Sequence, residues 1–382
     1  MDINMKFIHL SDLHIGKRLN EYSLLEDQEY ILHQIVEIID NEKPDAVIIA
    51  GDVYDKSVPS AEAVKLFDDF LFMLSERNLQ VFVISGNHDS PERIAFGSRL
   101  MDSSGIHMSP VYNGSVCPTV LSDEFGDVKV YMLPFVKPAN VRRFCEEEIN
   151  SYTEAIAKAI EMMDIDSSGR NVIVTHQFVT GASRSESEEI SVGGSDNVDA
   201  DVFSVFDYVA LGHLHSPQCC GNDTVRYCGT PLKYSFSEAS DEKSVTVVVL
   251  EQKGKYYIKT VPLKPLRDMV EIRGKYDELT LKSYYDGTTL CDDYVHITLT
   301  DEEDIPDAAA KLHTVYHGLM KLDYDNKRTR SMTEFADTVN TENRTPADLF
   351  AEFYEKQNGK PMDTAQTDYI NELIQTLEEE QI

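Results

Sequence analysis

Long apolar runs, paired cysteines and a basic leader are missing from this 382-residue sequence. No stretch of eighteen apolar residues occurs, so we expect no membrane span. The first residues do not turn from basic to apolar, as those of a signal peptide would. The cysteines include no Cys-x-x-Cys pair, which argues against a disulfide framework and against a zinc ribbon. These absences predict a cytoplasmic protein with reduced thiols.

Basic residues are also scarce. Lysine and arginine number 35 against 67 aspartates and glutamates, which gives a formal charge of −32. A chain this acidic should repel polyanions unless metal ions, a partner or a local basic patch reverses the field. The charge therefore argues against a protein that binds nucleic acid unaided, and it suits one that binds divalent cations.

What the sequence does contain is a recurring pattern of short apolar runs that end in polar residues. Such runs are too short for helices and suit buried strands. Each run delivers His, Asp or Asn at its carboxyl end, and glycines near these ends let the chain turn sharply. We interpret the five ends as parts of one site. The runs are Phe7–His14, Ala46–Asp52, Val81–Asp89, Asn171–His176 and Tyr208–His215.

Helical patterns alternate with the first three of these strands. Apolar spacing predicts a helix over 24–41, which Pro44 stops, and Ser60 is a good N-cap for a second helix over 61–77. A third helix is predicted over 91–101, starting at a proline. This β-α-β-α-β order with apolar strands implies right-handed crossovers and a sheet covered by helices, which is an α/β fold.

The middle of the chain alternates between strand and helix patterns. Short strands are predicted within 106–134 and within 207–261. One long helix is predicted over 138–163, and the Ser-, Gly- and Glu-rich segment 180–199 predicts a long loop beside His176.

Beyond a boundary at 262–265, the pattern predicts a small α+β module followed by two helices. The module has expected strands at 269–273 and 294–299 and an expected helix at 305–317. The apolar faces of the two last helices either dock the helices of a partner or fold back on their own chain. These helices are expected at 345–357 and 363–380, and the predicted domains are 1–264, 265–328 and 329–382.

The strand ends have the composition of a metal site. Residues two apart in an extended segment point to the same side, so Asp12 with His14, and His213 with His215, can each grip one ion. Imidazole with carboxylate suits Mn²⁺, Fe²⁺ or Zn²⁺ better than Ca²⁺ or Mg²⁺. The candidate ligands exceed what one ion needs, which predicts two ions, and they are Asp12, His14, Asp52, Asn87, His176, His213 and His215.

Two ions about 3.5 to 4 Å apart are suited to splitting phosphoesters. A carboxylate such as Asp52 is the natural bridge between them, and His88 could protonate the leaving oxygen. A single His after a strand is more often structural than a ligand, and an Asp after Gly is usually a turn or a cap. Five such ends in one chain favour the metal site over those readings.

The strand-end motifs together resemble the signature of the calcineurin-like metallophosphoesterases. The runs at 190–194 and 229–237 and the tail at 350–359 narrow the likeness to bacterial nuclease subunits related to the double-strand-break repair nuclease of archaea and eukaryotes. Asp55 stands where archaeal and eukaryotic relatives often carry a His. The motifs are Asp12-x-His14, Gly51-Asp52, Gly86-Asn87-His88-Asp89, His176 and Gly212-His213-x-His215.

This resemblance implies a four-layer α/β/β/α sandwich with a small α+β capping domain, a C-terminal helical tail and two Mn²⁺ ions. It makes His88 the catalytic acid, and it assigns Asp12, His14, Asp52 and His215 to one ion and Asp52, Asn87, His176 and His213 to the other. It also implies a homodimer that joins an SbcC-type ATPase in a heterotetramer, with the tail helices on the ATPase coiled coil. The implied activity is cleavage of double-stranded DNA ends, single strands and hairpins in replication, recombination and repair at the nucleoid.

Some basic residues near the ligand turns are candidate DNA contacts, although each alone is equally an ordinary surface charge. They are Lys17, Arg18, Arg93 and Arg184, with Arg142 and Arg143 as further candidates. One alternative is the same chemistry on nucleotides, cyclic nucleotides or phosphoproteins, against which the cap module and acidic tail argue. A second is a scaffold without metal, against which the intact ligand set argues. The helices at 60–77 and 92–102 are the expected dimer interface.

Overall fold

The computed structural model describes residues 4–182 and 196–327, with scattered positions from 329 to 374. The chain divides into two compact units, Met1–Met269 and Val270–Ile382. The predicted division into three parts at 264 and 328 remains a prediction. Among the described residues, no helix is both long enough and apolar enough to cross a membrane.

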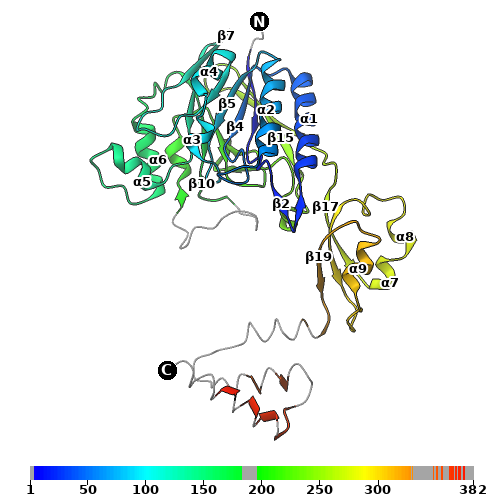
Figure 1. The fold of residues 1–382 in the computed structure, drawn as a ribbon. Coiled ribbons are helices and arrows are strands. Elements are labelled where there is room, and N and C mark those ends of the chain that lie inside the picture. The colour runs from blue at the N-terminus through cyan, green and yellow to red at the C-terminus, as the bar shows by residue number, and fades with distance from the viewer. Residues whose placement is uncertain are drawn as a thin grey trace. The chain divides into compact units, whose positions relative to one another are not determined.

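The first sheet of the first unit has six strands in the order β16-β15-β1-β4-β5-β6 (Figure 1). Strands β1, β4, β5 and β6 run parallel, so their carboxyl ends meet at one edge, while β15 and β16 are antiparallel. The strands are β1 (Met5–Leu10), β4 (Ala46–Ala50), β5 (Gln80–Ile84), β6 (Ile106–Met108), β15 (Ser244–Leu250) and β16 (Tyr256–Pro262).

The second sheet also has six strands, in the order β13-β14-β12-β9-β8-β7. Its central strands β14, β12, β9 and β8 are parallel, with an antiparallel strand at each edge. The strands are β7 (Thr119–Asp123), β8 (Gly126–Leu133), β9 (Arg170–His176), β12 (Tyr208–Gly212), β13 (Gln218–Cys220) and β14 (Asn222–Tyr227). Short pairs complete the unit: β2 (Arg18–Leu19) with β3 (Tyr22–Ser23), and β10 (Phe178–Val179) with β11 (Asn197–Val198).

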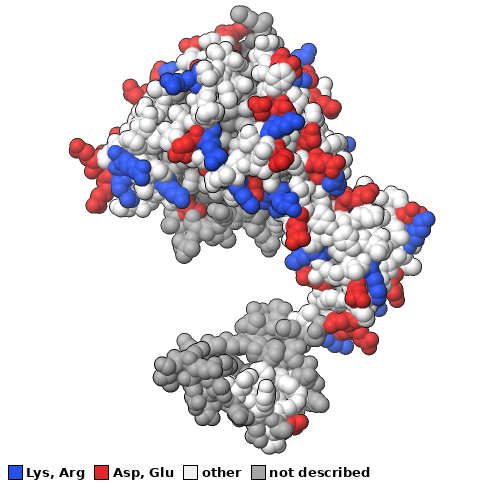
Figure 2. Space-filling model, in the orientation of Figure 1, with Lys and Arg blue, Asp and Glu red and all other residues white. Residues whose placement is uncertain are grey.

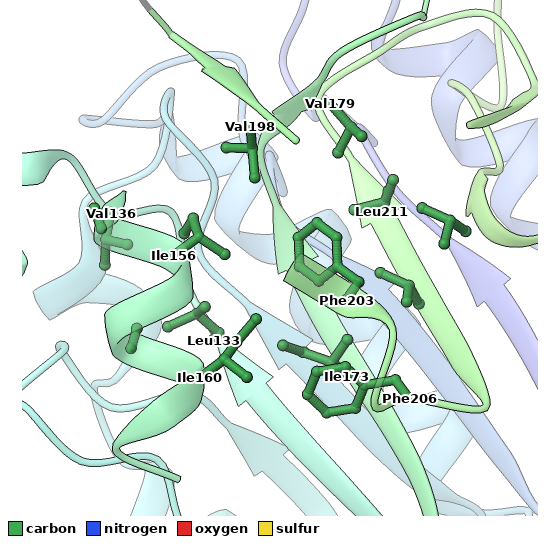
Figure 3. Packing of buried hydrophobic residues seen from close by; sticks show 14 of the residues in the cluster. Leu133, Val136, Ile156, Ile160, Ile173, Val179, Val198, Phe203, Phe206 and Leu211 are labelled. Carbon is green, nitrogen blue, oxygen red and sulfur yellow. The ribbon is translucent and has the colours of Figure 1, made fainter. Parts of the chain in front are cut away.

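The two sheets face each other across one apolar core. Alternate side chains of both sheets fill it, among them Phe7, Phe82, Val174 and Tyr208. The opposite faces are covered by helices: α1 (Leu25–Glu42) and α2 (Ala61–Ser75) lie on the first sheet. On the second sheet, α6 (Tyr152–Glu161) and η3 (Ala200–Phe203) pack around Leu133, Ile156, Ile160, Ile173, Phe203 and Leu211 (Figure 3). The four-layer α/β/β/α prediction is therefore confirmed.

Helix starts agree with their predicted signals more closely than helix lengths do. The Ser60 hydroxyl accepts a hydrogen bond from the Ala63 N–H and caps α2, as predicted. The predicted helix over 91–101 is wrong, because Gly97 at φ +74° separates α3 (Pro91–Ile94) from α4 (Ser98–Met101). A 3-10 turn, η1 (Asp102–Ser104), follows.

The predicted helix over 138–163 is also wrong. The chain forms α5 (Pro138–Val141) and η2 (Arg142–Phe144), and then becomes extended at Cys145. A capping box between Ser151 and Glu154 starts α6 as a separate helix.

In the second unit, a three-stranded sheet in the order β17-β18-β19 packs against short helices. The expected helix over 305–317 is shorter, because Asp307 has a left-handed backbone and precedes the first helical residue. The predicted tail helices fall largely outside the described residues. The elements are β17 (Met269–Gly274), α7 (Tyr276–Leu279), α8 (Lys282–Tyr285), β18 (Tyr294–Leu299), α9 (Ala308–His313) and β19 (Gly318–Tyr324).

Candidate metal centre

The candidate site lies where the carboxyl ends of β1, β4 and β5 meet those of β9 and β12. Two glycines allow the close approach of these ends. A Cβ on Gly212 would lie 1.8 Å from the Ala50 carbonyl oxygen, and a Cβ on Gly86 would lie 2.1 Å from Oδ1 of Asp52. Any larger residue at either position would push the two sheets or the two loops apart.

One half of the site is built around His14 and His215, both buried. Their Nε2 atoms lie 3.2 Å apart, and Asp12 is close enough to share an ion with both. Two imidazole nitrogens that bind one ion at about 2.1 Å and near a right angle lie about 3 Å apart. The geometry of this half therefore fits a metal ion.

The other half is built around Asn87, His176 and His213. The Asn87 side-chain oxygen lies 2.9 Å from Nε2 of His176 and 3.0 Å from Nδ1 of His213. His176 donates from Nδ1 to the Ala50 carbonyl at 2.9 Å, which leaves Nε2 as a ligand atom. These three atoms also converge as the ligands of one ion would.

Asp52 lies between the two halves. Its Oδ2 is 3.7 Å from Nε2 of His14 and 3.4 Å from Nε2 of His176, while Oδ1 accepts a hydrogen bond from the His88 N–H. The Asp12 carboxylate accepts from the His213 N–H. The structure thus brings all seven predicted ligand residues together, with Asp52 placed to serve both halves.

The backbone is strained at this site. Asp12, His14, Asp52 and His213 all have positive φ, at 53°, 43°, 48° and 105°. Such conformations cost about 1 to 3 kcal/mol each and persist where the surrounding structure enforces them. The strain turns the side chains out of the strands and toward one another.

Burial and charge shift the ionisation of these groups. Burial alone would lower the pKa of His176, but the Asp52 carboxylate outweighs it and raises the pKa to about 9. Burial would raise the pKa of Asp52, but the charge of His176 outweighs it and lowers the pKa. Burial raises the pKa of Asp12 and lowers that of His14 well below its usual value. Four closely packed ionisable groups of mixed sign suit a divalent cation.

His88 lies at the more open side of the site. Its Nε2 is 3.9 Å from Oδ2 of Asp52, and its Nδ1 is 3.2 Å from the Asp55 carbonyl oxygen. The side chain is 19% exposed, whereas those of His14 and His176 are 1% and 0% exposed. His88 is therefore the site histidine that a substrate reaches more easily.

Two carboxylates behind the ligand histidines escaped the sequence reasoning. Nδ1 of His14 lies 4.0 Å from Oδ1 of Asp55, and Nδ1 of His215 lies 3.4 Å from Oε1 of Glu238. Burial would raise the pKa of Glu238, but the His215 hydrogen bond and Lys243 lower it to about 2. The signal for Glu238 was its place directly after the 229–237 run.

The candidate DNA contacts are in varied settings. Lys17 forms an ion pair with Asp55 at 2.8 Å, and Arg142 donates to the Ile149 carbonyl. Arg18 on β2 and Arg93 on α3 are exposed, and Arg184 lies outside the described residues. Figure 2 shows lysines and arginines intermingled with acidic residues on the visible face of the first unit.

Comparison with known proteins agrees with this geometry. The family model for the calcineurin-like phosphoesterases matches residues 5–217, and a second, described as the type 5 capsule protein repressor C-terminal domain, matches 265–358. The chain belongs to the calcineurin-like phosphoesterase family, whose members are metal-dependent phosphoester hydrolases.

Within that family its relatives are nuclease subunits. It is 32% identical over 378 residues to SbcD, the smaller-lettered component of nuclease SbcCD, from Staphylococcus epidermidis, with 97% of this chain and 98% of the relative covered. It is 32% identical over 386 residues to the protein of the same name from Staphylococcus saprophyticus, with 98% and 99% covered. A solved dimetal phosphatase from Danio rerio aligns with 69% of this chain and 99% of its own at 11% identity, with a TM-score of 0.38 that supports no inference.

Proposed function

We propose that this chain is the nuclease subunit of an SbcCD-type complex, a metal-dependent phosphodiesterase that cuts DNA in replication, recombination and repair. The substrates are double-stranded ends, for exonuclease cleavage, and single strands and hairpins, for endonuclease cleavage. The observation that carries the proposal is the convergence of seven ligand residues on a shared Asp52, in a chain related to nuclease subunits over nearly its whole length.

The centre would hold two divalent cations, for which the mixed imidazole and carboxylate set favours Mn²⁺. One cation would be held by Asp12, His14, Asp52 and His215, and the other by Asp52, Asn87, His176 and His213. When bound, such ions lower the pKa of water and neutralise the charge that develops on the phosphate.

His88 would then serve as the general acid. It stands beside Asp52 without belonging to either ligand set, and its partial exposure lets it face the leaving oxygen. The Asp55 carbonyl, 3.2 Å from Nδ1, orients the ring so that Nε2 can carry the transferred proton.

The large negative charge requires help in holding DNA. Local basic side chains such as Lys17, Arg18, Arg93 and Arg184 would contact the strand, and an SbcC-type ATPase would supply most of the grip. The segment 329–382 would dock on the coiled coil of that ATPase, after a capping domain at 265–328 and the nuclease domain at 1–264. We expect the complex in the cytoplasm, at the nucleoid.

A homodimer would complete a heterotetramer with two ATPase subunits. Its proposed interface is α2 with α3 and α4, where Phe72, Phe96 and Leu100 are 61%, 82% and 82% exposed. Large apolar side chains this exposed are typical of contact surfaces.

Cleavage of a hairpin DNA in Mn²⁺ tests the function, with and without the SbcC-type ATPase and ATP. We expect His88→Ala to bind both ions and to lose cutting by about 10²- to 10⁴-fold, because only the proton donor is removed. Elemental analysis checks the metal content. Retained cutting would remove the acid role from His88.

Two further results would redirect the proposal. Hydrolysis of nucleotides, cyclic nucleotides or phosphoproteins with DNA left intact, even beside the ATPase, would favour the alternative substrates. A purified protein that binds no metal would favour a scaffold.

A further inference from the structure

Glu238 is a fully buried carboxylate beside the metal centre. It ends the short 3-10 turn η4 (Phe236–Glu238), and its Oε2 lies 2.6 Å from Nζ of Lys243, whose side chain is 4% exposed. Burying an ion pair loses the hydration of both charges, and apolar residues of the same size often stabilise a fold as well or better. Stability alone therefore does not account for this pair.

The pair holds His215 at two points. Oε1 of Glu238 lies 3.4 Å from Nδ1 of the ring, and Nζ of Lys243 donates to the His215 carbonyl at 2.9 Å. The Thr230 N–H donates to the same carbonyl at 3.0 Å, and the Tyr234 N–H donates to Oε2 of Glu238 at 3.4 Å. Both the ring and the peptide of His215 are thus fixed by one buried network.

The network also selects the tautomer of the ring. Nε2 of His215 faces Nε2 of His14 at 3.2 Å and is the atom placed to bind a cation. A nitrogen that binds a cation must be unprotonated, so the ring proton belongs on Nδ1 and needs an acceptor there. Oε1 of Glu238 is that acceptor.

We propose that Glu238, balanced by Lys243, is a positioning residue that fixes the orientation and tautomer of His215 and so strengthens the binding of one divalent cation. The proposal rests on the proposed function, in which His215 is a ligand. Glu238 acts through His215 and contacts neither the cation nor the substrate.

Titration of the metal-free, full-length protein with Mn²⁺ tests this role. We expect Glu238→Gln to weaken the binding of one of the two ions by about 10- to 100-fold and to leave the other unchanged. Asp123→Asn is the matched control, because Asp123 and Arg170 form another buried ion pair, with both side chains 5% exposed, that contacts none of the predicted ligands. Wild-type affinities for both ions in Glu238→Gln, or an equal loss in Asp123→Asn, would overturn the proposal.

Nitrogen-15 NMR of the imidazole rings gives a readout that a merely structural role would not move. In the metal-free wild type we expect the His215 proton on Nδ1, and we expect this signal to shift in Glu238→Gln. The signal is assigned by its loss in His215→Gln. A proton on Nε2 in the wild type would overturn the proposal even if Glu238→Gln failed to fold. A wild type that binds no Mn²⁺ but carries the proton on Nδ1 would instead contradict the proposed function.

Discussion

The two halves of the metal centre are supported by different chemistry. In the half with His14 and His215, a carboxylate stands behind each ring, and each carboxylate is paired with a lysine: Asp55 with Lys17, and Glu238 with Lys243. In the other half, His176 donates to a peptide carbonyl and the neighbouring ligand is the neutral amide of Asn87. A ring that donates to a carboxylate is a more basic ligand, so the first half should hold its cation more tightly.

Exposure differs in the same sense. Asp12, His14 and His215 are all buried, whereas Asn87 is half-buried and lies beside the more open His88. The half with the weaker ligands is therefore the one nearer to the substrate. This division suits a centre in which one ion is a fixed anchor and the other exchanges more readily.

Asp52→Asn should erase the distinction between the halves, because the carboxylate is shared by both predicted ligand sets. We expect nuclease activity to fall by at least about 10²- to 10³-fold, with loss of bound Mn²⁺ from both positions. Initial rates on hairpin DNA and elemental analysis measure these effects. Asp40→Asn removes an exposed carboxylate paired with Arg77 and should change neither. Two retained ions and near-normal cutting in Asp52→Asn would refute the shared role.

Proton release should distinguish the halves by pH. In the metal-free protein the pKa of His176 is about 9, so this ring is protonated at pH 7 and must lose its proton to bind a cation. The affinity of that half should therefore rise with pH, approaching tenfold per unit, and level off above about 9. His14, with its lowered pKa, is already neutral and should add no such slope. Mn²⁺ calorimetry in buffers of different ionisation enthalpy measures the protons released. Equal pH slopes for both ions would break the comparison.

Asn87→Ala should affect only the more open half. Removal of its oxygen leaves His176 and His213 without their shared neighbour, and we expect about tenfold weaker binding of the second ion. The tighter step of a Mn²⁺ titration should stay in place. If the tighter step weakened instead, the order of affinities proposed here would be reversed.

Asp55→Asn should have the smallest effect. Asp55 lies 4.0 Å from His14 Nδ1, farther than Glu238 lies from His215, and its side chain is 13% exposed. Water can take over part of its role, so we expect less than tenfold weaker binding of the tighter ion. The same titration compares it with Glu238→Gln. A larger loss in Asp55→Asn would show that His14, and not His215, is the ring held more firmly.

The sequence was sufficient to locate the ligands because parallel strands place their carboxyl ends at a common edge. Apolar runs ending in Asp12, Asp52 or His176 have few other readings once five occur together. The second sheet of the sandwich did not emerge from periodicity, and only the family resemblance supplied it.

Other features depend on contacts that no local pattern records. Glu238 meets His215 only because the chain turns between residues 229 and 238, and the 3.4 Å contact depends on the side-chain conformations at both ends. The break between α5 and α6 was missed because the apolar residues of 138–163 keep a helical spacing across it. There, the capping box at Ser151 overrides the pattern.

The near contact of Gly212 with Ala50 has a mechanical consequence. Each half of the centre takes ligands from both sheets: His215 joins Asp12 and His14, and His176 joins Asn87. Ions bound there would rivet the two sheets at this rim, so the protein can cut only while its sandwich is closed at that rim. Stripping the ions should loosen the seam locally, far from the cores that keep the rest of the fold intact.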